Sequence, residues 1–270
     1  MAAWESADVT LPPSRKAIDR LGDELRSAAA PSDAALNALQ GWRVLHEEAL
    51  VRVETRLRDE LNLEPGVRLK TTLTILDKLR RMPDLQLSRM QDIAGARIVA
   101  EASLTEQDEL VARIAPLFGP DARLVDRRAK PSHGYRAVHV VVKSEGISVE
   151  IQIRTALQHL WAMVGEGFAA QWGRTLQYGL DPRDPDVPAA STLPAVTRRD
   201  VIETLRRWSD EIAHVEQSRD TLQRVLRLQS PTAAHAAGGD VFEASTTYRA
   251  EPEEWPALEK LSRIAGALSC

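Results

Sequence analysis

The sequence predicts an α/β protein, in which helices flank a β-sheet. Two neighbouring segments, residues 137–143 and 148–155, are rich in β-branched residues, and the second alternates apolar with polar side chains. This alternation has the period of a half-buried strand. Several longer segments instead carry apolar residues at spacings of three and four, which is typical of amphipathic helices. Together these patterns support a β-hairpin and several helices, as in an α/β protein, but not the order of the strands.

The strand predicted at residues 148–155 places Glu150, Gln152 and Arg154 on one face, because alternate residues of a strand point the same way. The opposite face is apolar and suits packing against helices. The short segment 144–146 contains glycine and predicts an antiparallel hairpin, which brings His139 near the polar face. A carboxylate, an amide and a guanidinium in a row indicate a functional site.

Helices are predicted at residues 14–28 and 33–63, where they form a scaffold for the sheet. A third helix follows the turn signal at Pro65 and Gly66, with Thr71 or Thr72 as its N-cap. We expect three leucines of this helix to face inward, and these are Leu73, Leu76 and Leu79. The positive end of this helix is a favourable place for a polyphosphate.

Further along the chain, residues 91–99 predict a buried strand, residues 104–118 a helix, and Leu124 with Val125 the start of another strand. Thr155 and Gln158 have the spacing of a capping box and open the next helix, in which we expect Trp161 to be a core residue.

The prolines from residue 181 onward predict a linker. Residues 198–228 then predict a long helix or a helical hairpin, suited to packing or oligomerisation, and a terminal helix contains Trp255 and Ile264. We therefore divide the chain into an N-terminal helical region at 1–66, a core at 67–180, and a linker with a helical extension at 181–270.

Composition excludes several classes of protein. The chain has 270 residues, of which 43% are hydrophobic and 27% charged, as in ordinary globular proteins. Its one cysteine, Cys270, supports neither a disulfide framework nor a cysteine-rich zinc site. No apolar run is long enough for a membrane helix, so we expect a cytoplasmic protein. The net charge is −4, but basic residues concentrate in residues 68–99 and 123–136.

Four motifs carry a resemblance to a known family. Gly-Tyr-Arg-Ala-Val-His at 134–139 and Val-Glu-Ile-Gln-Ile-Arg-Thr at 149–155 resemble the synthetase domain of the RelA/SpoT family, the pyrophosphokinases that make guanosine tetra- and pentaphosphate. Arg-Leu-Lys-Thr at 68–71 and Asp-Ile-Ala-Gly-Ala-Arg at 92–97 precede them in the family's order. The resemblance implies a mixed, largely antiparallel sheet, similar to the nucleotidyltransferase-like core, with helical N- and C-terminal extensions.

The resemblance also implies an ATP site. Its expected residues are Arg68, Lys70, Thr72, Lys78 and Arg97. Two of these, Arg68 and Arg97, would sandwich the adenine, because guanidinium groups stack well on aromatic faces. Mg²⁺ is the expected cofactor, since it binds one or two carboxylates together with substrate phosphates. Asp92 and Glu150 are the expected metal ligands.

Catalysis and acceptor binding are assigned in the same way. Glu150 is the expected general base, and Gln152 would orient that carboxylate or the acceptor ribose. The acceptor nucleotide would stack on Tyr135 and meet other polar residues, namely Lys130, Arg128, His139 and Gln152. For Arg123 and Arg127, a solvated loop and a phosphate contact are equally good interpretations.

The sequence departs from the family at two places. Lys130-Pro-Ser-His-Gly-Tyr135 is one residue longer than the usual Lys-Pro-Asn-Gly-Tyr, and it lacks the asparagine. In the helix after the central strand, Gly165 stands where the family commonly has an acidic residue, with Glu166 beside it.

Three functions follow from these patterns. The first is a pyrophosphokinase that transfers the β,γ-diphosphate of ATP to the ribose 3′-hydroxyl of GDP or GTP. The second is a toxin that pyrophosphorylates the 3′ end of tRNA, which would have an antitoxin partner. The third is a non-catalytic nucleotide sensor or RNA-binding module. The chain has no His-Asp pair for the family's hydrolase site, so it resembles a small stand-alone synthetase, a group that often forms homo-oligomers through terminal helices.

Overall fold

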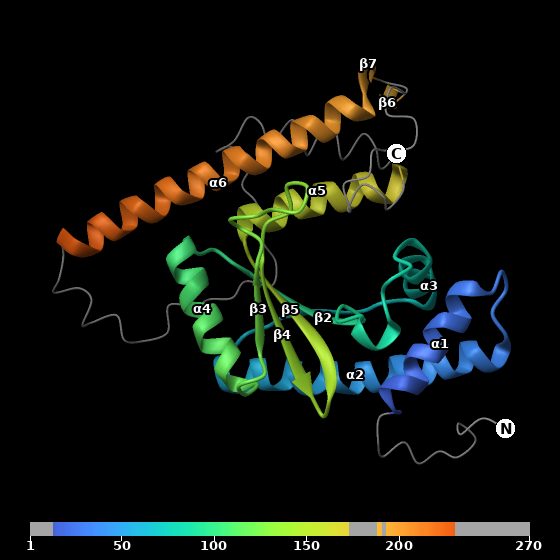
Figure 1. Ribbon diagram of the computed structural model, residues 1–270. Helices are drawn as coiled ribbons and strands as arrows, with labels where there is room; N and C mark the ends of the chain where they lie inside the picture. The colour runs from blue at the N-terminus through green and yellow to red at the C-terminus, as the bar shows by residue number, and fades with distance from the viewer. Residues whose placement is uncertain (1–12, 173–187, 191–192, 230–270) are drawn as a thin grey trace. The chain divides into compact units, whose positions relative to one another are not determined.

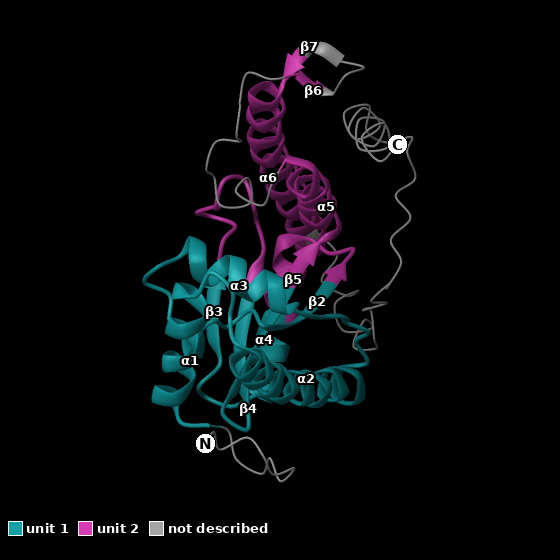
Figure 2. Cartoon of the chain, turned by 90° about the vertical axis from the view of Figure 1, so that its right-hand side faces the viewer, with its two compact units in different colours: residues 1–98, 111–125, 139–152 teal, residues 99–110, 126–138, 153–270 magenta. Residues whose placement is uncertain are grey.

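The computed structural model describes residues 13–172, 188–190 and 193–229 (Figure 1). The chain divides into two compact units whose segments alternate along the sequence (Figure 2). The first unit comprises residues 1–98, 111–125 and 139–152, and the second comprises residues 99–110, 126–138 and 153–270.

Five strands form one mixed sheet, which confirms the α/β prediction. Their order across the sheet is β1, β2, β5, β4, β3, and β1 pairs with β2 in antiparallel fashion. The strands are β1 (Gly66–Leu69), β2 (Ala94–Ala100), β3 (Arg123–Asp126), β4 (Val138–Ser144) and β5 (Ile147–Thr155). A smaller sheet consists of β6 (Pro188–Ala190) and β7 (Leu193–Thr197).

The predicted hairpin is present as β4 and β5. Glu145 and Gly146 join the strands with positive φ angles of 51° and 81°, as a type I′ turn requires. Along β5 the apolar residues are buried, whereas Glu150 and Gln152 are partly exposed. The predicted alternation is therefore confirmed, although Arg154 at the end of the polar row is buried.

The helices of the first unit begin where the sequence provides caps. α1 (Arg15–Ser27) and α2 (Asp33–Leu61) start after serine N-caps, and α3 (Thr72–Arg81) starts after Thr71, whose hydroxyl accepts a hydrogen bond from the backbone of Thr74. α1 contacts α2, α3 and the short 3₁₀ helix η1 (Leu87–Arg89), and α2 contacts β1 (Figure 1). This assembly supports the edge of the sheet on which Arg68 lies.

Two expectations for this region were wrong. Pro65 and Gly66 predict a turn, but Gly66 begins β1. Leu73 was expected to face inward, but it is 78% exposed, and Ile75 is buried instead. At about 100° per residue, Leu73 lies about 120° from Leu79 around the helix, which takes it out of the buried stripe.

In the second unit, α5 (Ala156–Trp172) begins with the predicted capping box. The backbone of Gln158 donates to the hydroxyl of Thr155, and the backbone of Thr155 donates to the side chain of Gln158. Trp161 is half-buried and packs against the apolar cluster of α5 and α6, as expected of a core residue.

The described part of the C-terminal region holds one continuous helix, α6 (Arg198–Gln229), so the alternative of a helical hairpin is wrong. α6 packs on α5 through Val201 and Leu205, whereas Leu222 and Leu226 are exposed. The linker predicted from residue 181 is partly wrong, because residues 188–190 and 193–197 are strands. The expected terminal helix lies outside the described residues.

α4 (Leu104–Leu117) agrees with its predicted range, and Leu110 and Ile114 are fully buried.

Within the described part of the chain, none of the helices combines the length and apolar character needed to cross a membrane. The division at residues 66 and 180 stays a prediction.

Candidate active site

Asp92 is the centre of a charged cluster in the first unit. The ammonium group of Lys70 donates to Oδ2 of Asp92 at 2.8 Å, and that of Lys78 donates to Oδ1 at 2.8 Å and to Oδ2 at 2.7 Å. Lys70 follows β1 and is buried, Lys78 comes from α3, and Asp92 precedes β2. Three elements therefore bring two of the predicted ATP ligands to a predicted metal ligand.

The two lysines keep the Asp92 carboxyl ionised. Burial alone raises the pKa of the Asp92 carboxyl, but the charges of Lys78 and Lys70 and their hydrogen bonds outweigh burial and lower the pKa to about 2. Burial also lowers the pKa of Lys70, and the attraction of Asp92 only partly opposes this shift. The Asp92 carboxyl is therefore ionised at neutral pH.

Arg68 and Arg97 share one face of the β1–β2 pair. Arg68 lies opposite Gly95 and Arg97 lies opposite Gly66, so the two arginines are diagonal neighbours, each facing a glycine. Diagonal neighbours of an antiparallel pair are about 7–8 Å apart, which a flat ring can bridge. The glycines add no side chain to this part of the face, and the adenine sandwich stays a prediction. Thr72, the first residue of α3, is half-buried.

Glu150 lies on β5 and is held by two neighbours. Nδ1 of His139 on β4 is 2.9 Å from Oε1 of Glu150, and Nε2 of Gln152 donates to Oε2 at 2.9 Å. Burial raises the pKa of Glu150, but the hydrogen bond and charge of His139, followed by the hydrogen bond of Gln152, shift it below its ordinary value. Glu150 is therefore ionised at neutral pH and fixed in orientation.

These contacts bear on two predicted roles. Gln152 donates to the Glu150 carboxylate, so this contact is observed, while its role in orienting the carboxylate or the ribose stays a prediction. His139 is buried against Glu150, so its expected contact with phosphate or nucleobase stays a prediction, while its contact with the carboxylate is observed.

The two carboxylates expected to bind Mg²⁺ lie in the same unit. The negative charge of Asp92 raises the pKa of Glu150, against the lowering by His139 and Gln152. The two carboxylates are therefore close enough to interact electrostatically. The described residues contain no cluster of three or more His, Cys, Asp or Glu side chains able to hold a metal alone. A pair of carboxylates fits a Mg²⁺ ion that arrives with its nucleotide, because such an ion keeps phosphate and water ligands.

The second unit contains the predicted acceptor loop. Ser132 and Tyr135 pair across a tight turn, in which the backbone of Tyr135 donates to the carbonyl of Ser132 at 2.9 Å. His133 and Gly134 between them have φ angles of 55° and 93°. Both φ angles are positive, as in the turns that Asn-Gly favours, although histidine occupies the first position.

Tyr135 is fixed by Arg154, a residue of the polar row on β5 for which the sequence predicts no specific role. Nη2 of Arg154 donates to the Tyr135 hydroxyl at 3.0 Å, and the guanidinium carbon is 5.0 Å from the centre of the ring. Arg154 is only 2% exposed. The alternation that put Arg154 in the row with Glu150 was the available signal.

The basic residues of the loop differ in their surroundings. Arg128 pairs with Asp126 and Asp108, each at 2.6 Å, so its expected role in binding the acceptor stays a prediction. Lys130 is exposed, as a phosphate ligand would be. Arg127 is half-buried, and its backbone donates to the carbonyl of Ala137.

Arg123, on β3 in the first unit, is exposed and donates to the side chain of Gln91 at 2.6 Å. This contact fits a surface position and leaves both interpretations of Arg123 open.

Comparison with known proteins identifies the family. The family model described as "Region found in RelA / SpoT proteins" matches residues 67–175. Uncharacterized proteins of Mycobacterium bovis and Mycobacterium tuberculosis are 43% identical over 188 residues, which cover 68% of this chain and 68% of each relative. GTP pyrophosphokinase YjbM of Bacillus subtilis is 34% identical over 112 residues, 36% of this chain and 51% of that protein.

Solved structures agree in fold. Small alarmone synthetase 1 from Bacillus subtilis has a TM-score of 0.52 and 20% identity, covering 71% of this chain and 98% of that one. The same protein bound to its product pppGpp has a TM-score of 0.52 and 21% identity, covering 70% and 98%. The fold of this chain is thus the one that these small alarmone synthetases have. The chain belongs to the RelA/SpoT family.

Proposed function

We propose that the chain transfers the β,γ-diphosphate of ATP to the ribose 3′-hydroxyl of GDP or GTP. The hydroxyl oxygen attacks the β-phosphorus, the bond from that phosphorus to the α,β-bridging oxygen breaks, and AMP leaves. The observation that carries the proposal is Glu150, a carboxylate held ionised by His139 and Gln152 in the unit that contains the Asp92 cluster.

In this mechanism Glu150 accepts the proton of the attacking hydroxyl. Its two hydrogen-bond partners keep the carboxylate in one orientation, as a general base requires. Lys70 and Lys78 hold the transferred phosphates, and positioning with charge neutralisation supplies most of the catalysis.

Asp92 and Glu150 would hold a Mg²⁺ ion, which when bound neutralises charge on the phosphates. Arg68 and Arg97 bind the adenine from the glycine-lined face of the β1–β2 pair.

For the acceptor we propose Tyr135 as the surface on which the guanine stacks and Lys130 as a phosphate contact. Arg154 fixes the tyrosine ring, so the ring is ordered before the nucleotide arrives. The names of two relatives support a guanine nucleotide: GTP pyrophosphokinase YjbM, and a small alarmone synthetase crystallised with pppGpp.

The 3′ end of tRNA ranks second as acceptor. Transfer RNA needs a broad basic track for its backbone. Arg128 and Arg136, two of the loop's cations, already form ion pairs with acidic residues of their own unit. This reduces the positive charge available for such a track. An antitoxin partner is expected only with the tRNA activity.

The test measures the AMP that the wild type and Glu150→Gln release from ATP and GTP. Glu145→Gln is the matched control, because Glu145 is an exposed carboxylate in the turn of the same hairpin. We expect Glu145→Gln to release AMP from ATP and GTP as the wild type does, and Glu150→Gln to release almost none while keeping its thermal unfolding curve. Substantial turnover by Glu150→Gln would remove that residue from the catalytic role. A wild type that binds both nucleotides without releasing AMP would indicate the non-catalytic sensor.

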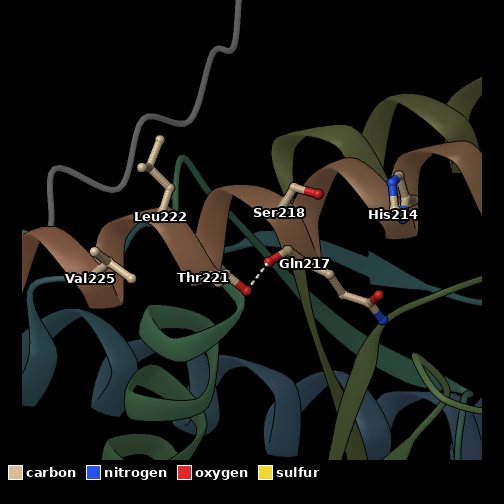
Figure 3. A pocket seen from close by; sticks show the side chains of 6 residues that line it. All are labelled: His214, Gln217, Ser218, Thr221, Leu222 and Val225. Atoms are coloured by element: carbon tan, nitrogen blue, oxygen red, sulfur yellow. Dashed lines mark hydrogen bonds between the residues drawn. The ribbon is translucent and has the colours of Figure 1, made fainter.

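We also propose that the chain is a cytoplasmic homo-oligomer that associates through α6. This helix exposes Leu222 and Val225 along a hollow of about 430 Å³, whose wall also includes His214 and Thr221 (Figure 3). Leu226 of the same helix is also exposed. Light scattering of the chain with Leu222→Asp and Leu226→Asp should report fewer subunits than the wild type. An unchanged subunit number would exclude this surface.

A further inference from the structure

Helix α6, which lies outside the region matched to the family, contacts the acceptor loop directly. The hydroxyl of Ser209 donates to the carbonyl oxygen of Gly134 at 2.6 Å and accepts from Nε of Arg136 at 2.9 Å. Ser209 is 2% exposed, so both bonds are shielded from water. One helical side chain thereby binds the loop on either side of Tyr135.

Arg136 extends this connection across the loop. Besides Ser209, its guanidinium group donates to Oδ1 of Asp210 at 2.7 Å and to the backbone carbonyl of Arg128. The side chain of Arg136 is largely buried. The beginning of the loop at Arg128 and its end at Arg136 are therefore tied to two consecutive residues of α6.

The turn itself rests on a closely fitting surface. A Cβ added to Gly134 would lie 2.6 Å from the Trp161 ring and 3.3 Å from Cβ of Ser209. The indole of Trp161 donates to the carbonyl of Leu205 on α6 at 2.7 Å, which fixes the ring. α5 and α6 thus support the turn with no space for a side chain at Gly134.

These contacts matter because the loop has little regular structure of its own. Within the loop, the structure shows two hydrogen bonds between backbone groups. One crosses the turn from Tyr135 to Ser132, and the other runs from Arg127 to Ala137. Removal of Ser209 would leave a carbonyl and a guanidinium nitrogen without their buried partner, and unsatisfied buried groups are destabilising. We therefore expect the ordering of Tyr135 to depend on α6 as well as on Arg154.

We propose that Ser209 is a positioning residue for the acceptor nucleotide: it holds the loop so that the ring of Tyr135 is presented in its binding orientation. Asp210 supports it through Arg136. This inference rests on the acceptor role proposed above for Tyr135. It makes α6 part of the acceptor site while leaving the ATP residues of the first unit untouched.

The experiment compares Ser209→Ala with Ser218→Ala in the full chain. Ser218 is an exposed serine on the same helix and is the matched control. With GTP varied at saturating ATP, we expect the KM for GTP to rise about tenfold in Ser209→Ala, the loss expected of a buried hydrogen-bond partner, with the KM for ATP unchanged. Ser218→Ala should equal the wild type in both constants.

A second readout is independent of activity. Hydrogen exchange of the Tyr135 amide, which donates across the turn, should be faster in Ser209→Ala and unchanged in Ser218→Ala. If Ser209→Ala fails to fold, Asp210→Ala is measured in its place, because the side chain of Asp210 is 76% exposed. We expect Asp210→Ala to raise the KM for GTP by less than tenfold.

The outcomes separate the two proposals. Suppose that the wild type forms product, but the variants keep the wild-type KM for GTP and the wild-type exchange of the Tyr135 amide. This result overturns the inference on Ser209 and leaves the proposed function standing. A wild type that forms no product from any acceptor overturns the proposed function, and the exchange measurement then decides whether Ser209 holds the loop.

Discussion

Nδ1 of His139 lies 2.9 Å from Oε1 of Glu150, and the two residues lie on the adjacent strands β4 and β5 of the hairpin. The hydrogen bond and charge of His139 are the main causes that keep the pKa of Glu150 below its ordinary value against the effect of burial. We therefore expect the histidine to keep the carboxylate ionised and fixed in orientation.

His139→Ala should lower kcat at neutral pH by about tenfold or more, within the range of a general acid–base contribution, with smaller changes in KM. It should also raise the pKa of Glu150. The acid-side fall in activity should then occur at a higher pH than in the wild type. A pH–rate profile measures this shift, and an acid limb at the wild-type position would show that His139 does not tune Glu150.

Asp92→Asn should destabilise the first unit, because Lys70 and Lys78 would lose the carboxylate between them. We expect the free energy of unfolding at pH 7 to fall by about 3 kcal/mol, as when one partner of a buried ion pair is removed. Urea denaturation measures it. Asp77→Asn is the control, since Asp77 is an exposed carboxylate of α3.

The same carboxylate predicts a pH dependence. The pKa of Asp92 is lowered from 3.8 to about 2, so its contribution to stability is fully present above pH 3.8 and is lost as the pH falls through about 2. This contribution is on the order of 2 kcal/mol. Wild-type stability should lose this amount on acidification, whereas Asp92→Asn should lack that component. Parallel acid dependences in the two proteins would contradict the ion-pair assignment.

Gly95→Ala tests the adenine face. A Cβ at Gly95 would meet only the backbone oxygen of Glu150, at 3.5 Å, so the fold should tolerate it. The methyl group would nevertheless occupy the face between Arg68 and Arg97. We expect the KM for ATP to rise several-fold, with little change in the melting temperature. An unchanged KM for ATP would place the adenine elsewhere.

Gly134→Ala should destabilise the protein more than Gly119→Ala. Both glycines have positive φ angles, 93° and 85°, so both substitutions introduce backbone strain. Only at Gly134 would the new methyl group collide with Trp161, while nothing lies within 4 Å at Gly119. Urea denaturation of the two variants isolates the collision, and equal losses would mean that Trp161 moves freely out of the way.

Much of the fold follows from local pattern. The alternation in residues 148–155 gave the faces of β5, and Thr155 with Gln158 gave the start of α5, because strand period and capping are properties of nearby residues. The sequence does not predict strand β1, because its four residues begin inside the Pro65-Gly66 turn signal and carry too little pattern, and its pairing with β2 defines it.

The candidate site shows the same limit. The residue types of Asp92, Lys78 and Glu150 were visible in the sequence, but the ion pairs of Asp92 depend on the packing of α3 beside the start of β2. The contact of Ser209 with the loop joins residues 75 positions apart, so no local signal could indicate it. The roles of all these residues stay predictions until they are measured.

The most direct measurement of the central claim uses ATP labelled at the β-phosphate, incubated separately with GDP, GTP, adenine nucleotides and deacylated tRNA. The β-phosphate is the inner phosphate of the transferred group, so its label follows the new bond to the acceptor. We predict labelled guanosine product and an equal amount of AMP from the wild type, and neither from Glu150→Gln. Label on tRNA but not on guanine nucleotides, or an absence of AMP with every acceptor, would contradict the account.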